Sequence, residues 1–237
     1  IELGMDELCF TEHSDYDVPT VVNCDYDAYF KEMEEMKEKY KGQITLKTGI
    51  EFGIQVHTTK AYEETFGQYP FDFVIFSCHQ VENKEYWRQE PQKGKTQLEY
   101  NRRYYQEILD VVKAYKDYSI LGHLDVIKRY DLNGEIELEK IKDLIEQIFE
   151  VVIADGKGIE LNTSSRAYHL KSLMPSREIL ELYHDMGGKI ITIGSDAHNA
   201  DRVGDRVMES QKILKEIGFN GIYTFDQMKP KFHEFKF

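Results

Sequence analysis

The sequence predicts an α/β fold in which a parallel β-sheet is closed, or nearly closed, into a barrel with its helices outside. Short apolar runs rich in β-branched and aromatic residues alternate with longer segments of helical periodicity, which is typical of βα units. No stretch rich in Pro, Gly or Ser divides the chain, so we expect one domain over residues 1–237. An open, doubly wound sheet is the competing arrangement, because it also buries each strand on both sides.

Six short apolar runs are predicted to form the strands of this sheet. They are Glu7–Thr11, Thr45–Phe52, Phe71–Ser77, Ser119–His123, Gly158–Asn162 and Lys189–Gly194. Amphipathic segments predict helices over Asp25–Tyr40, Leu98–Tyr118, Glu137–Ala154, Arg177–Met186 and Arg206–Ile217. Gly187 and Gly188 follow the fourth predicted helix, where glycine commonly ends a helix.

The composition limits the classes of partner. A net charge of −13 opposes binding to nucleic acid or to an anionic membrane, because phosphate groups would repel the protein. Cys9, Cys24 and Cys78 are odd in number and far apart, so neither a disulfide framework nor a CxxC metal site is expected. With no run of about 18 apolar residues and no pattern of a signal peptide, we expect a cytoplasmic protein.

Each predicted strand ends in a polar group that can bind metal or substrate. The strand ends are Thr11–His13, Gly49–Glu51, Ser77–His79, Leu121–His123, Glu160–Asn162 and Gly194–His198. In a parallel βα barrel the carboxyl ends of the strands meet at one rim, so these side chains are expected to share a pocket.

This set of side chains favours a metal centre over separate structural roles. A lone His such as His123 is more often a core or capping residue, but crowded carboxylates and imidazoles lose hydration and repel one another without a cation. The mixture of His, Glu and Asp without thiolate suits zinc, iron or manganese. Asp196 and His198 lie on the same face of an extended segment. Glu51 is a candidate bridge between two cations, or else an ion-paired residue at a strand end.

Taken together, these motifs resemble those of the PHP (polymerase and histidinol phosphatase) superfamily, and within it the histidinol-phosphate phosphatases. The matching motifs are Thr11–Ser14, Gly49–Glu51, Ser77–His79, Gly122–Asp125, Glu160–Asn162 and Gly194–His198. The resemblance spans essentially the whole chain and implies a distorted (β/α)7 TIM-like barrel that holds two to three divalent ions of zinc, manganese or iron. It also implies that Glu51 bridges two ions and that His79 and His123 complete one of them.

The resemblance assigns His13 and His198 to another ion and Asp196 to the remaining one. It also reveals a departure, since the superfamily's first strand carries a His-x-His pair and no such pair precedes His13. Residues Ile1–Met5 read like the end of a helix. We therefore expect a first strand within about 20–30 residues that precede Ile1, and an incomplete metal site without it.

The expected reaction is hydrolysis of a phosphate monoester by a metal-bridging hydroxide, because cations lower the pKa of bound water toward about 7. Glu51 would hold the cations, and Asp196 or His198 would pass a proton to the leaving alcohol. By the resemblance, the substrate is L-histidinol phosphate, which gives L-histidinol and inorganic phosphate in histidine biosynthesis.

Cationic side chains near the strand ends are candidates for binding the phosphate. Arg166 comes first because it directly follows a strand end, and Lys128, Arg129 and Arg202 come next. His169 is a further candidate for contacting substrate, or else for capping its loop. The alternative for each cation is an ordinary solvated surface charge.

Other activities compete with this hypothesis. PHP proteins also resemble nucleases attached to bacterial DNA polymerases and phosphotyrosine phosphatases, although the acidic balance weighs against a polynucleotide substrate. The segment Val81–Thr96, with Trp87, is expected either to close over a small molecule or to be an exposed loop. A non-catalytic metal-binding scaffold and a metal-dependent amidohydrolase are the remaining alternatives, and no strand end carries the bridging Lys that the amidohydrolases usually have.

Overall fold

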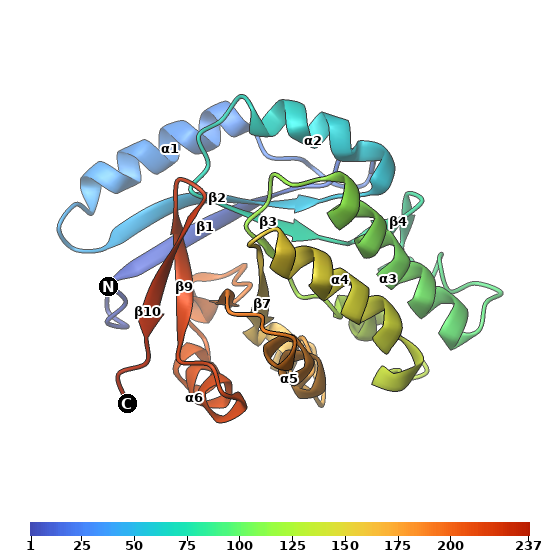
Figure 1. The fold of residues 1–237 in the computed structure, drawn as a ribbon. Coiled ribbons are helices and arrows are strands. Elements are labelled where there is room, and N and C mark those ends of the chain that lie inside the picture. Colours follow the sequence, from blue (N-terminus) through green and yellow to red (C-terminus); the bar gives the residue numbers. More distant parts are fainter.

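A computed structural model describes residues 1–237 as a curled, six-stranded parallel sheet whose outer face is covered by helices (Figure 1). The strands lie in the order β1 (Glu7–Ser14), β2 (Thr45–Gly53), β3 (Phe73–Ser77), β6 (Ile120–Leu121), β7 (Gly158–Asn162) and β8 (Ile191–Gly194). All neighbouring pairs are parallel. The architecture is a distorted TIM-like barrel, and all six predicted strands are confirmed.

Six α-helices accompany the sheet. They are α1 (Tyr26–Lys39), α2 (Thr59–Phe66), α3 (Gln97–Ala114), α4 (Lys142–Ala154), α5 (Arg177–Asp185) and α6 (Val207–Ile217). The short 3-10 turns are η1 (Val56–Thr58), η2 (Tyr86–Arg88), η3 (Val126–Tyr130), η4 (Leu138–Lys140), η5 (Thr163–Arg166) and η6 (Ala200–Arg202). The five predicted helices are present and α2 was missed. The prediction was wrong for residues 115–118, because Tyr115 is extended and leads the chain toward β6.

Local signals explain where several helices begin and end. The Asp25 side chain accepts a hydrogen bond from the backbone N–H of Ala28 and begins α1. Thr96 and Glu99 form a capping box at the start of α3. After α5, Gly187 has a φ of 89°, and its N–H donates to the carbonyl of His184 as in a Schellman motif. The predicted glycine terminator of α5 is confirmed.

Two antiparallel hairpins were not predicted. One is β4 (Gln80–Val81) with β5 (Lys84–Glu85), and the other is β9 (Gly221–Asp226) with β10 (Lys229–Glu234). Phe225 of β9 packs against Phe73, Ile75 and Ile120, so the second hairpin covers the amino-terminal side of the strands. Its turn is tied there, because the N–H of Met228 donates to the carbonyl of Asp72. None of the helices has the length and apolar character needed to cross a bilayer.

Candidate metal centre

The carboxyl ends of the strands surround one pocket of about 230 Å³. All six side chains that the sequence singled out as metal ligands line it: His13, Glu51, His79, His123, Asp196 and His198. The expectation that strand ends distant in sequence meet in one pocket is therefore confirmed. Their roles as ligands remain a prediction.

Glu51, on β2, lines this pocket, and the ends of β3 and β6 place polar groups around its carboxylate. Its Oε1 accepts a hydrogen bond of 2.7 Å from the Ser77 hydroxyl. The same oxygen lies 3.0 Å from the Nε2 of His123 and 3.2 Å from the Nε2 of His79. Burial opposes ionisation of Glu51, but the two imidazoles hold its pKa well below the usual range. Glu51 is therefore a carboxylate.

A buried carboxylate that the sequence analysis did not identify, Asp15, lies between His13 and His79. Its Oδ2 is 2.5 Å from the Nδ1 of His13, and its Oδ1 is 2.9 Å from the Nδ1 of His79. Burial alone would raise the pKa of Asp15, but His79 and His13 lower it. A signal for this residue was present, because Asp15 follows His13 by two positions as His198 follows Asp196.

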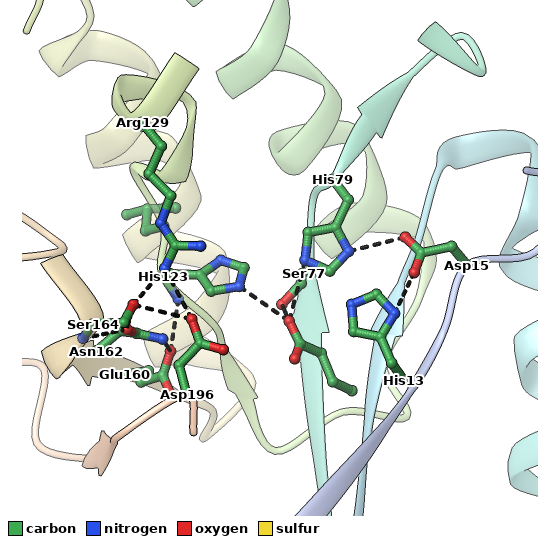
Figure 2. Close-up of polar contacts among 12 residues, drawn as sticks. His13, Asp15, Ser77, His79, His123, Arg129, Glu160, Asn162, Ser164 and Asp196 are labelled. Carbon is green, nitrogen blue, oxygen red and sulfur yellow. Dashed lines mark hydrogen bonds and ion pairs between the residues drawn. The ribbon is translucent and has the colours of Figure 1, made fainter. Parts of the chain in front are cut away.

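Asp196 forms the opposite side of the pocket (Figure 2). Its Oδ2 accepts hydrogen bonds from the Arg129 guanidinium at 2.9 Å and from the Ser164 hydroxyl at 3.0 Å. Burial opposes ionisation, but His123 and Arg129 lower the pKa of Asp196. Next to it, the buried Glu160 accepts the backbone N–H of His123 at 2.9 Å and so fixes the backbone that carries this imidazole.

His198 belongs to neither of the two sets of converging side chains, the one around Glu51 and the one around Asp15. Its side chain is 75% exposed, and its Nδ1 lies 3.1 Å from the backbone carbonyl of Asp196. His13, which the resemblance pairs with His198, instead stacks on His79 with 4.7 Å between ring centroids. The assignment of His13 and His198 to a shared ion therefore remains a prediction.

The donor set fits divalent cations. Two groups of side chains each bring one ligand atom per residue within 4.8 Å of the others: His13 with Asp15 and His79, and Glu51 with His79 and His123. In the second group, two imidazole Nε2 atoms converge on one carboxylate oxygen. This arrangement suits a divalent cation, which would accept the lone pairs of the two nitrogens and balance the charge of the carboxylate.

The sequence is similar to a known protein family and to individual known proteins. The family model described as PHP domain matches residues 1–164. The chain belongs to the PHP domain family. One similar protein is a histidinol-phosphatase of Lactococcus lactis subsp. lactis, 31% identical over 95% of this chain and 85% of that protein. A probable histidinol-phosphatase of Thermotoga maritima is 28% identical over 92% of this chain and 82% of its own length.

Solved structures show the same fold as this PHP domain. The crystal structure of histidinol phosphate phosphatase from Lactococcus lactis, complexed with zinc, L-histidinol and phosphate, superimposes with a TM-score of 0.84 at 27% identity, over 97% of this chain and 89% of that one. A putative histidinol phosphatase from Listeria monocytogenes gives a TM-score of 0.71 at 16% identity, over 88% and 89% of the two chains, and shows the fold alone.

Arg129 is the one candidate phosphate-binding residue among those that line the pocket of this PHP domain. Its guanidinium lies over the Tyr168 ring, 3.9 Å from the ring centroid, and this contact orients it beside Asp196. The neighbouring Lys128 is buried elsewhere, where its Nζ donates to Asp125 at 2.8 Å and to Ser172 at 2.7 Å. The two adjacent cations therefore have different surroundings.

The other three candidate substrate contacts are not among the pocket-lining residues. Arg166 and His169 are exposed on the loop after β7. Arg202, in η6, is half-buried and pairs with Asp205 at 3.2 Å. The expectation that Arg166 is the first phosphate contact has no support from this geometry, because direct sequence proximity to a strand end does not set the direction of its side chain.

The segment Val81–Thr96 brings an aromatic side chain to the pocket. The β4–β5 hairpin and η2 place Trp87 in the pocket wall, where it is 41% exposed. Its ring centroid lies 6.3 Å from that of Tyr130, which lines the same pocket. Trp87 is thus part of the pocket wall and is also partly exposed, so closure of this segment over a small molecule stays a prediction.

Metal binding is expected to release a proton. Burial alone would lower the pKa of His79, but Asp15 and Glu51 raise it to about 10, so the ring is protonated at neutral pH in the metal-free protein. A cation that binds His79 must displace that proton. Because of this one group, zinc affinity should weaken roughly tenfold for each pH unit below 10. Calorimetric titrations at pH 7.5 in buffers of different ionisation enthalpy should report about one proton released when the ion held by His79 binds. A heat of binding independent of the buffer would contradict this.

Proposed function

We propose that this PHP domain is a metal-dependent phosphatase that hydrolyses L-histidinol phosphate to L-histidinol and inorganic phosphate. The observation that carries the proposal is the convergence of Glu51, His79 and His123 in one pocket with the Arg129–Asp196 pair. The relative from Lactococcus lactis, whose crystal structure contains zinc, L-histidinol and phosphate, supports the substrate.

Bound divalent cations would supply Lewis-acid activation of water and neutralisation of phosphate charge. Glu51, His79 and His123 would hold one cation. The expected complement is two to three ions of zinc, manganese or iron. His13, Asp196 and His198 complete the proposed set of ligands.

The protein's own side chains would orient the substrate. Arg129 is held between Asp196 and the Tyr168 ring, and its free N–H groups can donate to phosphoryl oxygens as charge develops there. Trp87, Tyr130 and Tyr168 form an aromatic wall of the same pocket and would exclude water around the leaving group. Asp196 and His198 both line the pocket, as a proton donor to the leaving alcohol requires.

A substrate panel tests the proposal. The full-length protein would be assayed with histidinol phosphate, a phosphotyrosine peptide and a nucleoside monophosphate, each with zinc, manganese or iron. We expect kcat/KM for histidinol phosphate to exceed the others by at least about 100-fold, since a pocket that pairs polar substrate groups rejects compounds lacking them. Faster turnover of another ester would assign a different substrate, and metal binding without any turnover would favour a non-catalytic scaffold.

A further inference from the structure

We propose that Asp15 is a positioning residue of the metal centre, which holds the rings of His13 and His79 by their Nδ1 atoms and leaves both Nε2 atoms to bind cations. The inference rests on the proposed metal-dependent function, because it concerns residues of the same site. It adds a buried carboxylate that touches two of the proposed ligands.

The contacts of Asp15 divide evenly between the two rings (Figure 2). Each of its carboxylate oxygens faces one Nδ1, at 2.5 Å for His13 and 2.9 Å for His79. The two rings are stacked with an interplanar angle of 16°. Asp15 has no solvent exposure, so these imidazoles take the place of water around its charge.

With its Nδ1 facing Asp15, the His79 ring points its Nε2 atom toward Glu51. Its Nε2 lies 3.2 Å from the Oε1 of Glu51, and the Nε2 of His123 lies 3.0 Å from the same oxygen. A carboxylate on one nitrogen of an imidazole sets the proton on that side, raises the basicity of the other nitrogen and fixes the ring for metal binding. Asp15 therefore directs the His79 Nε2 toward Glu51.

Hydrogen bonds and close packing from neighbouring residues fix the position of Asp15. Its backbone N–H donates to the Asn23 side chain at 2.7 Å, and the Tyr62 hydroxyl donates to the preceding carbonyl of Ser14 at 2.9 Å. A Cβ at Gly53 would lie 1.9 Å from Oδ1 of Asp15, so the close approach of β2 to this carboxylate requires glycine.

The variant Asp15→Asn tests the role with little change of shape. The amide offers one acceptor oxygen and one donor NH2 to two N–H groups, so at least one ring loses its partner. We expect zinc affinity to fall about 10–100-fold, as on removal of other partners of ligating histidines. The matched control is Asp17→Asn, which neutralises an exposed carboxylate two residues away that contacts only His57 and Asn83. Its zinc affinity should equal that of the wild type.

A spectroscopic measurement separates orientation of the rings from a general structural role. In zinc-loaded protein with ¹⁵N-labelled histidine, His13 and His79 should both show a proton on Nδ1 and coordination through Nε2. In Asp15→Asn at least one of these Nδ1–H signals should move or broaden. Coordination through Nδ1 in the wild type would make Asp15 a competitor for the metal and overturn the proposal, even if the variant does not fold.

The outcomes also distinguish the inference from the function on which it rests. A folded Asp15→Asn variant with wild-type zinc affinity would overturn the role of Asp15 and leave the proposed function standing. A wild-type protein that binds no zinc would overturn both.

Discussion

Replacing Glu51 with Gln is expected to abolish phosphatase activity, with kcat reduced by about 10³-fold or more. The change keeps the size of the side chain but removes the negative charge on which Ser77, His79 and His123 converge. A neutral amide is a poor ligand for zinc and cannot bridge two cations, so metal content should fall together with activity.

Kinetics and elemental analysis of the same preparation test this prediction. The matched control is Glu12→Gln on the same strand as His13, because Glu12 is exposed and absent from the pocket lining. It should retain wild-type activity and metal content. Full activity of Glu51→Gln with intact metal would exclude the proposed mechanism, whereas intact metal with lost activity would restrict Glu51 to a role in the chemical step.

Replacing Arg129 with Met should lower kcat/KM for histidinol phosphate by about 10²–10³-fold. Arg129 is a nearly buried cation that lines the pocket, and its loss removes charge that would stabilise the phosphoryl oxygens. It also leaves the Asp196 carboxylate without the guanidinium that lowers its pKa. Arg129→Lys should be intermediate, because an ammonium provides charge but not the planar fork of donors.

The control for Arg129 is Arg166→Met, which removes an equal charge from an exposed position outside the pocket. We expect little change in its kcat/KM, and we expect inhibition by inorganic phosphate to weaken only in the Arg129 variants. A larger loss in Arg166→Met than in Arg129→Met would restore Arg166 as the phosphate contact and reverse the assignment made from the geometry.

The strands were predictable because their signal is local. The strand Phe73–Ser77 is almost wholly apolar and all of its residues are buried, and this requirement is visible in the run itself. The α2 helix and the β9–β10 hairpin carry weaker patterns, since many of their residues are exposed. Their positions depend on contacts made elsewhere, such as that of Phe225 with Phe73.

The sequence by itself determined the alternation of strands and helices and the polar residue at each strand end, and these were enough to indicate the PHP family. Only the tertiary structure decided which of these groups face one another. Lys128 and Arg129 are adjacent, yet one donates to Asp125 and the other to Asp196. Asp15 contacts both His13 and His79 only because the fold places the ends of β1 and β3 side by side. Periodicity reports burial along one segment, whereas a site depends on side-chain directions from several segments at once.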